Sequence, residues 1–395
     1  MIPIHEALQQ VLKQRSTYGT EKISLLEAKG RFLAEDIFTD RDAPPFDRVM
    51  MDGIAIQHKD LDEPPAASYK VQGIQAAGSP QLSLQEETYC LEIMTGAILP
   101  HQADTIIPYE EVEIKEGRAY IQAAKLAKRF IHYKGSDSKK GELILSKGKK
   151  ITAADIGLLA TVGKSTVSVA KLPKVAIIST GDELVEVDQE PQAHQIRKSN
   201  AYTLWAGLME EGITGKLYHI NDDKEALRQS LAALLEEFDV LLLSGGVSKG
   251  KFDHIPEILH ELGVKKIFHR VAQRPGKPFW FGAHQSLNTK VFAYPGNPVS
   301  TYVNHFYYFQ QWLYASLGKD MALSRVELAQ SIPSNPALAL FVSVRLDPKS
   351  GAAKALNHNG SGDLFSLAQT EGFVLLPARG TDYMPGEKVD FLALK

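Results

Sequence analysis

Three short apolar runs, each followed at once by a glycine-rich turn, constrain the fold of this 395-residue chain most strongly. The runs at 175–179, 239–244 and 291–294 are typical of strands buried on both faces of a sheet. Strands that alternate with helices indicate a parallel sheet covered on both faces, so this part is predicted to be an α/β domain. The patterns between and after the runs predict one further strand at 216–220 and helices at 200–211, 224–237, 255–262 and 299–317.

The flanking sequence predicts two β-rich parts on either side of the α/β domain. Near the N-terminus, residues 4–13 and 23–33 have apolar positions at helical spacing. Residues 46–122 then read as short strands and turns with clustered prolines, which favours a mainly β lobe. Apolar–polar alternation at 341–346 and 387–392 predicts a small β domain at the C-terminus.

Composition and charge exclude several classes of function. Apolar residues make up 44% and charged residues 23%, as in globular proteins with hydrophobic cores. The 44 basic and 47 acidic residues give a formal charge of −3, so a nucleic-acid partner held by phosphate neutralisation is not expected. A single cysteine, Cys90, excludes a disulfide framework and a multi-cysteine metal site within the chain. No apolar run reaches the ~18 residues of a membrane span, and no signal-peptide core begins the chain, so we expect a cytoplasmic protein without a membrane partner.

The glycine turns predict a site for an anionic ligand. Strand-to-helix turns of a parallel sheet meet at its carboxyl edge, where ligands bind. Glycine lets backbone N–H groups approach an anion closely, and a following helix adds a favourable dipole. In the third turn Asn297 is a good helix N-cap and Pro298 a good first helical residue. Nearby, Arg274 and Lys277 are two cations on a Pro-Gly turn, which suits a phosphate or another oxyanion.

Acidic residues gather at the same predicted edge. Carboxylates beside an anionic ligand repel it unless a hard cation lies between them, so this composition indicates Mg²⁺ or a similar ion. Capping and solvation are the alternative roles, and Asp253 lies close to the predicted start of a helix, where an N-cap is needed. The acids concerned are Asp182, Glu183, Asp222, Asp223 and Asp253.

Three other patterns have simpler interpretations. Residues 157–165 are similar to a phosphate-binding P-loop but have one residue too many between the glycines and follow a helical pattern. Residues 246–250 fit a nucleophile elbow, yet further residues separate them from the next predicted helix. The aromatic group at 306–309 with Trp312 is expected in the core or at a subunit interface.

A series of short motifs resembles the molybdopterin molybdenumtransferase family of molybdenum-cofactor biosynthesis. The scaffold protein gephyrin contains a domain of this family. The resemblance covers nearly the whole chain, and its motifs lie, in the family's order, at residues 44–47, 51–53, 94–97, 179–184, 195–200, 244–248, 275–278, 295–300, 360–362 and 366–368.

The resemblance implies a fold and an assembly. It implies a homodimer whose active site joins the α/β domain of one subunit to the β lobe of the other, and a molybdopterin adenylyltransferase as a possible partner. The implied domains are an extended N-terminal domain (1–45 and 128–172), an inserted β lobe (46–127), a molybdopterin-binding α/β domain (173–318) and a C-terminal β domain (319–395).

The resemblance also implies a reaction, in which molybdate enters adenylylated molybdopterin and AMP leaves in a Mg²⁺-dependent cleavage. The implied catalytic residues are Asp52, Thr95, Glu183, Asp253 and Lys277, and the implied Mg²⁺ ligands are Glu183, Asp222, Asp223 and Asp253. The implied ligand-binding residues are Gly181, Arg197, Ser199, Asn200, Gly245, Gly246, Ser248, Arg274, Gly276, Pro295, Gly296, Asn297 and Ser300.

Several residues depart from the family's pattern, and most of the changes add positive charge. Arg48 begins a triplet that replaces Asn-Ser-Ala, Lys198 replaces an aspartate, Lys249 replaces a valine, and Arg274 takes the place of a lysine. Added cations agree with an anionic ligand, but they equally fit a paralogue with an altered substrate or a partner role. Two alternatives to the transferase therefore stay open. One is a non-catalytic interaction protein that kept the fold, and the other is a hydrolase of a nucleotide-linked substrate.

Overall fold

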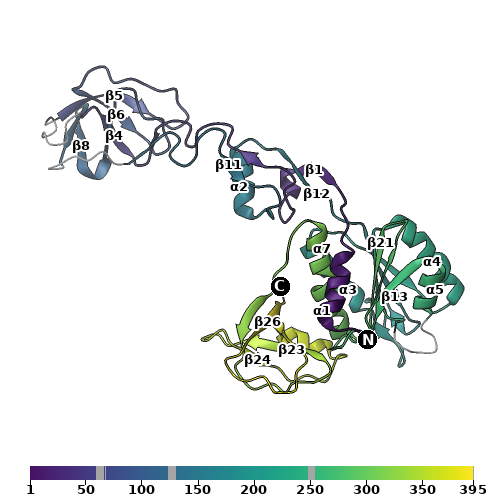
Figure 1. Cartoon of the computed structure of the whole chain (residues 1–395). Helices are drawn as coiled ribbons and strands as arrows, with labels where there is room; N and C mark the ends of the chain where they lie inside the picture. The colour runs from purple at the N-terminus through teal and green to yellow at the C-terminus, as the bar shows by residue number, and fades with distance from the viewer. Residues whose placement is uncertain (59–65, 67, 123–129, 248–253, 395) are drawn as a thin grey trace. The chain divides into compact units, whose positions relative to one another are not determined.

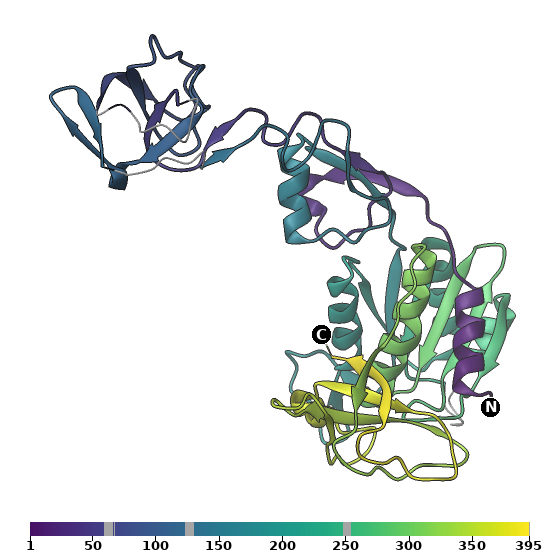
Figure 2. The ribbon, with the colours of Figure 1, turned by 60° about the vertical axis from the view of Figure 1, so that its left-hand side comes forward.

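The computed structural model describes the whole chain except residues 59–65, 67, 123–129, 248–253 and 395. The described residues form two compact units (Figures 1 and 2). The first unit contains Met1–Ile23, Gly30–Ala34 and Ser168–Lys395, and the second contains Ser24–Lys29 and Glu35–Val167. Within the described ranges, no helix combines the length and the apolar character that a membrane crossing requires.

A six-stranded sheet forms the centre of the first unit, in the order β16-β13-β17-β21-β20-β18. Three of the four parallel strands are the predicted apolar runs: β13 (Val175–Thr180), β17 (Val240–Ser244) and β21 (Thr289–Tyr294). The fourth, β16 (Lys216–Ile220), is the further strand predicted at 216–220. Two antiparallel strands that the sequence did not predict, β20 (Trp280–His284) and β18 (Val264–His269), extend this parallel sheet at one edge. The connection from β20 to β21 is too short for a crossover helix, so this pair forms a hairpin.

Helices cover both faces of this sheet (Figure 1). One face packs against α4 (Lys224–Glu237) and α5 (Ile255–Glu261). The other packs against α1 (Ile4–Lys13), α3 (Asn200–Glu210) and a long helix. The long helix consists of α6 (Pro298–Asn304), a π-helical segment η3 (His305–Phe309) and α7 (Gln310–Ser316).

The aromatic group of the long helix lies in the hydrophobic core, which is one of the two locations predicted for it; the other was a subunit interface. All four aromatic residues from Phe306 to Phe309 and also Trp312 are at most 5% exposed. Phe292 of β21 contacts the rings of Phe309 and Trp312 edge to face. These contacts fix the long helix against the sheet whose carboxyl edge carries the glycine turns.

A second sheet in the first unit forms the C-terminal β part. Its order is β19-β23-β25-β26-β22, with β24 paired to β23. The two-residue strand β19 (Gln273–Arg274) comes from the α/β part and pairs in parallel with β23 (Ala339–Leu346). The other elements are β22 (Ser324–Glu327), β24 (Ala353–Ala355), η4 (Leu364–Gln369), β25 (Gly372–Leu376) and β26 (Lys388–Ala393).

The second unit is largely β, as predicted. Its six-stranded sheet has the order β7-β4-β6-β5-β9-β8, from β4 (Gly53–Ile56), β5 (Ser68–Gln75), β6 (Tyr89–Ile93), β7 (Thr105–Pro108), β8 (Val112–Lys115) and β9 (Arg118–Ile121). Its remaining elements are η1 (Leu25–Glu27), β2 (Ile37–Phe38), β3 (Arg48–Val49), η2 (Tyr109–Glu111), β10 (Ile131–His132), β11 (Leu143–Leu145) and α2 (Ala153–Thr161). Helix α2 includes the start of the P-loop-like pattern, so this segment does not form a phosphate-binding P-loop, as expected.

The predicted helix at 23–33 was wrong. This stretch contains the end of strand β1 (Thr20–Ser24) and the single turn η1, capped by the Ser24 side chain. Leu26, one of the apolar positions behind the prediction, is 91% exposed, and Gly30 has a positive φ of 82° that ends any helix. Leu33 then pairs with Val169 of strand β12 (Thr166–Ala170), so sheet pairing replaces helix formation here.

Candidate active site

A cavity of about 290 Å³ lies where the three glycine turns meet, at the carboxyl edge of the parallel strands. Its wall includes Thr180, Gly245 and Gly296, one residue from each turn. At Gly245, with φ of 103°, an added Cβ would lie 2.9 Å from the Thr180 carbonyl oxygen. Only glycine allows the first two turns to approach this closely, and so leaves peptide groups exposed to a ligand.

Asn200 connects the turns to one another from the start of helix α3. Its Nδ2 donates to Oγ of Ser244 at 2.8 Å and to the carbonyl oxygen of Gly296 at 2.7 Å. The side chain therefore fixes the second turn relative to the third. Its neighbour Ser199 also lines the cavity, at the N-terminal end of the helix, where the dipole favours a negative group.

Charged side chains of the segment after β13 form another part of the cavity wall. Strands β14 (Leu184–Val185) and β15 (Ile196–Arg197) pair there and bring Glu183, Arg197 and Lys198 to the cavity. Lys198 is only 8% exposed, and its ammonium pairs with the Glu186 carboxylate, which lowers the pKa of Glu186. The wall thus contains both signs of charge.

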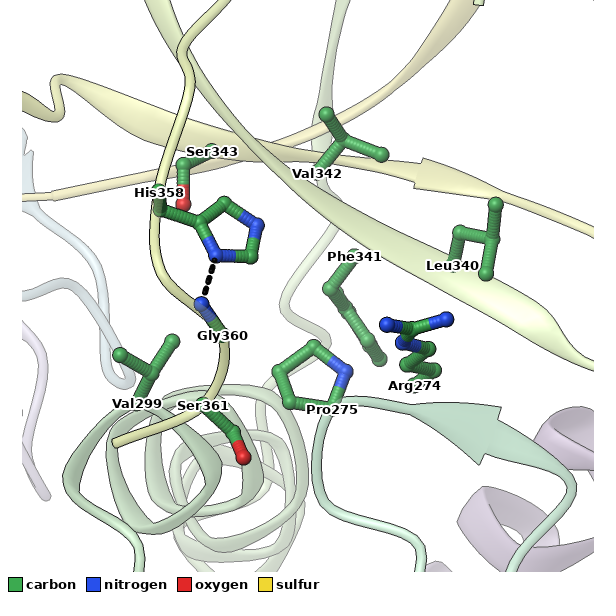
Figure 3. Close-up of a pocket in the computed structure, with 10 residues that line it drawn as sticks. All are labelled: Arg274, Pro275, Val299, Leu340, Phe341, Val342, Ser343, His358, Gly360 and Ser361. Carbon is green, nitrogen blue, oxygen red and sulfur yellow. Dashed lines mark hydrogen bonds between the residues drawn. The ribbon is translucent and has the colours of Figure 1, made fainter. Parts of the chain in front are cut away.

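A second cavity of about 370 Å³ lies between β19, the start of the long helix and the C-terminal sheet (Figure 3). Arg274, Ser343, His358 and Ser361 contribute its polar groups, and most of the other lining side chains are apolar. The Nδ1 of His358 accepts a hydrogen bond from the Gly360 N–H at 2.9 Å. In the neutral ring the proton therefore lies on Nε2, which makes that nitrogen a donor.

The two cavities share a wall. Ser361 lines the second cavity, and its Oγ accepts a hydrogen bond of 2.9 Å from Nδ2 of Asn297, which lines the first. The Val299 N–H also donates to the Ser361 carbonyl oxygen at 3.1 Å. The start of the long helix and residues 360–362 therefore contribute to the walls of both cavities.

The second unit carries a separate polar pair. Oδ1 of Asp52 accepts hydrogen bonds from the Thr95 N–H at 2.6 Å and from the Thr95 hydroxyl at 2.8 Å. These bonds, the backbone one foremost, lower the pKa of Asp52. Asp52 is therefore held as a carboxylate with a fixed orientation.

Comparison with known proteins identifies the family. Three family models match successive parts of the chain: "MoeA N-terminal region (domain I and II)" at residues 2–163, "Probable molybdopterin binding domain" at 176–308, and "MoeA C-terminal region (domain IV)" at 325–394. A Synechocystis protein named molybdopterin molybdenumtransferase is 38% identical over all of both chains. The chain belongs to the molybdopterin molybdenumtransferase family.

Other members agree in sequence and structure. The molybdopterin molybdenumtransferase of Bacillus subtilis is 31% identical and covers 100% of this chain and 94% of its own length. The crystal structure of a molybdopterin biosynthesis MoeA protein from Pyrococcus horikoshii has a TM-score of 0.81 at 28% identity and covers 100% of both chains. The predicted fold class, an α/β domain with β-rich parts on either side, is thereby confirmed.

Many of the residues that the family resemblance implies do lie together. Glu183, Arg197, Ser199, Asn200, Gly245, Gly296 and Asn297 line the first cavity, and Arg274 lines the second. Gly181, Gly246, Pro295 and Ser300 belong to the three turns or to the helix that follows them, and Gly276 and Lys277 follow Arg274. Ser248 and Asp253 lie outside the described residues.

The acids expected to bind Mg²⁺ do not form a complete set in the described part of the chain. No group of three or more His, Cys, Asp or Glu side chains suited to a metal ion occurs among the described residues. Asp223 caps helix α4 through a 2.8 Å bond from the Ala226 N–H. The N-cap position of α5 is His254, whose side chain makes no capping hydrogen bond, and the capping role considered for Asp253 lies outside the described residues.

The sequence does not predict a wall position for several polar residues, among them Lys198, His358 and Ser361. Lys198 is expected only as a departure from the family's pattern, and Ser361 lies in a family motif to which no role is assigned. His358 lies in none of the motifs that predict a site. All three lie near turns or strand ends, where a contact between distant segments decides the role of a side chain.

Proposed function

We propose that this chain is a molybdopterin molybdenumtransferase that inserts molybdate into adenylylated molybdopterin and releases AMP. The observation that carries the proposal is the pair of adjoining cavities, one built from glycine turns and one beside Arg274. Two anionic substrates need two sites that lie close enough for a group to pass between them. Membership of the family supports the same reaction.

The first cavity suits the nucleotide-linked pterin. Backbone groups of the glycine turns and the N-terminal end of α3 favour phosphate oxygens. Arg197 adds positive charge at the wall, where the charge of Lys198 is paired with that of Glu186. Asn200 would contribute indirectly by holding two of the turns in place.

The second cavity suits molybdate, a small tetrahedral oxyanion. The Arg274 guanidinium can donate two parallel hydrogen bonds, while Lys277, on the same turn, supplies a compact charge. Ser361 and Nε2 of His358 are further hydroxyl and N–H groups in the same wall. An apolar lining on the remaining sides strengthens such contacts by excluding water.

The proposal also includes a Mg²⁺ ion, the β lobe of a second subunit and a molybdopterin adenylyltransferase. The ion would offset charge on the pyrophosphate that is cleaved. Because the described acids do not form a complete ligand set, Glu183 is the described carboxylate best located to contribute, since it lines the first cavity. Asp52 and Thr95 would act from the lobe of a second subunit, and a molybdopterin adenylyltransferase in the cytoplasm would supply the substrate.

One reaction mixture tests the proposal. Purified protein is incubated with adenylylated molybdopterin and Mg²⁺, with and without molybdate, and both AMP and metallated cofactor are measured. We expect molybdate-dependent release of AMP together with metallated cofactor. AMP release that does not depend on molybdate would indicate the hydrolase. Binding of adenylylated molybdopterin without release of AMP would indicate the non-catalytic interaction protein.

A further inference from the structure

Three fully buried polar side chains form a connected network behind the turn that carries Arg274 and Lys277. Gln273, Asn304 and Tyr308 are each 0% exposed. The Tyr308 hydroxyl donates to Oε1 of Gln273 at 2.5 Å, and Nε2 of Gln273 donates to Oδ1 of Asn304 at 2.8 Å. Asn304 and Tyr308 are four residues apart on the long helix, so both can face the same neighbour.

The network ends on the peptide groups of the turn itself. Nε2 of Gln273 also donates to the Pro275 carbonyl oxygen at 2.9 Å, and Nδ2 of Asn304 donates to the Gly276 carbonyl oxygen at 3.2 Å. Two successive carbonyl groups are therefore held, one by Gln273 of β19 and the next by Asn304 of the long helix. This fixes the orientation of the peptide units that connect Arg274 to Lys277.

Close packing leaves the turn little room to move toward the helix. Gly276 has φ of 90°, and an added Cβ would lie 2.6 Å from Oδ1 of Asn304 and 2.7 Å from Nε2 of Gln273. Buried donors and acceptors that lose their partners are costly, so the hydrogen bonds of this network support one another. The turn is consequently defined by directional bonds rather than by apolar contact alone.

Strand alternation connects the network to the second cavity. Gln273 and Arg274 form β19, in which successive side chains point to opposite faces. Gln273 is buried in the network, whereas Arg274 is exposed and lines the cavity (Figure 3). A displacement of Gln273 would therefore change the direction of the Arg274 side chain as well as that of Lys277.

We propose that Gln273, Asn304 and Tyr308 are positioning residues that preorganise the Arg274–Lys277 turn for a tetrahedral oxyanion. The three side chains do not contact the ligand; they hold the two cations where it binds. The inference rests on the proposed function, because it requires the oxyanion to bind at this turn. Preorganised cations bind an anion without first having to be ordered, so loosening the turn weakens affinity without removing a charge.

The test measures molybdate directly, in the full-length protein. Gln273→Met keeps the length of the side chain and removes its hydrogen bonds. We expect the molybdate dissociation constant from calorimetry to rise about fivefold or more, with a parallel rise in KM for molybdate. The kcat at saturating molybdate and KM for adenylylated molybdopterin should stay within about twofold of wild type, because no reacting group is lost.

A matched control separates positioning from general stability. The buried Thr289 hydroxyl donates to the Leu235 and Phe238 carbonyl oxygens at the start of β21, at the opposite end of that strand from the glycine turn. Thr289→Val should lower stability yet leave molybdate affinity unchanged. If Gln273→Met changed kcat and both KM values in the same way as Thr289→Val, the network would be structural only and the inference would be overturned.

Lys277→Ala distinguishes failure of the inference from failure of the proposed function. We expect this variant to bind molybdate at least about tenfold more weakly. If Lys277→Ala and Gln273→Met both bind molybdate as wild type does, the oxyanion does not bind at this turn. If only Lys277→Ala weakens binding, the turn needs no positioning network.

A second, milder variant covers the case in which Gln273→Met does not fold. Tyr308→Phe removes one hydroxyl and leaves both amides, so the folded protein should show a smaller rise in KM for molybdate with kcat unchanged. A Tyr308→Phe variant with wild-type molybdate affinity and reduced thermal stability would also overturn the inference.

Discussion

The Asp52–Thr95 pair of the lobe makes a prediction at the scale of one residue. Both hydrogen bonds favour the carboxylate, so the pKa of Asp52 lies below its ordinary value. The two hydrogen bonds contribute fully to the free energy of unfolding at a pH above the ordinary pKa of an aspartate. This contribution is lost as the pH falls through the lowered pKa of the folded state.

Thr95→Val separates the two bonds. The variant removes the hydroxyl donor and keeps the backbone N–H, which is the larger cause of the shift. We therefore expect the pKa of Asp52 to rise part of the way to its ordinary value, as measured by carboxyl-carbon NMR titration. Asp42, whose pKa is lowered mainly by the Lys140 N–H, is the internal control and should not move. An unchanged Asp52 pKa would mean that the hydroxyl bond does not form in solution.

A second prediction at the residue scale concerns Mg²⁺. Asp253 lies outside the described residues, and the family resemblance assigns it to the ion. Asparagine lacks the negative charge that a hard cation prefers, so Asp253→Asn should slow AMP release about a hundredfold, equivalent to about 2.7 kcal/mol in the barrier. Raised Mg²⁺ should recover part of this loss.

Asp223→Asn makes the same change at another acid that the resemblance assigns to the ion and that caps α4 in the structure. Asparagine caps a helix about as well as aspartate, so α4 should keep its bond from the Ala226 N–H. A loss of AMP release that Mg²⁺ relieves in Asp223→Asn would support the ligand role that the resemblance implies for Asp223, whereas normal AMP release would leave it a helix cap. Normal AMP release in Asp253→Asn would remove Asp253 from them.

At the scale of elements, local sequence patterns predicted those helices and strands whose structure depends mainly on their own residues. The predicted bounds of α3, α4 and α5 agree with the structure to within one residue. The buried strands and the glycine turns after them were equally predictable, because apolar runs and turn residues are local signals. These strands, turns and helices contain most of the residues that line the first cavity.

Elements formed by pairing with distant segments were not predictable. Strand β19 consists of two residues and exists because Gln273 and Arg274 pair with β23, more than sixty residues away. The shared wall of the cavities likewise depends on Asn297 meeting Ser361. The periodicity of a segment gives no information about contacts with a distant segment, so the second cavity could not be predicted from the sequence.

Asn200 provides a prediction at this scale, because one side chain connects two turns. Asn200→Ala removes the bonds to Ser244 and to the Gly296 carbonyl oxygen, so the turns should separate slightly. We expect a loss of about 1–2 kcal/mol in the free energy of unfolding and weaker binding of adenylylated molybdopterin. Thr203→Ala, which removes a bond within the same helix, should leave that binding unchanged. Wild-type binding in Asn200→Ala would show that the turns need no such connection.

At the scale of the whole molecule, the proposed active site needs residues from both compact units. Asp52 and Thr95 belong to the unit that contains the lobe, whereas Arg274, Lys277 and both cavities belong to the other. We expect a homodimer in which each site combines the lobe of one subunit with the cavities of its partner. Light scattering should then give about twice the 43.5 kDa of one chain, and a single-chain mass at micromolar concentration would contradict the arrangement.

Subunit mixing tests the sharing of sites directly. In a dimer of one Asp52→Ala chain and one Lys277→Ala chain, a shared arrangement places both defects in one site and leaves the other site intact. Co-expression with random pairing should therefore restore about a quarter of wild-type activity, since half of the dimers are mixed and each has one working site. Asp52→Ala paired with Thr95→Ala is the control: both lobes are then defective, so no site recovers. If the first mixture is as inactive as this control, each site is contained in one chain, and Asp52 must reach the cavities of its own subunit.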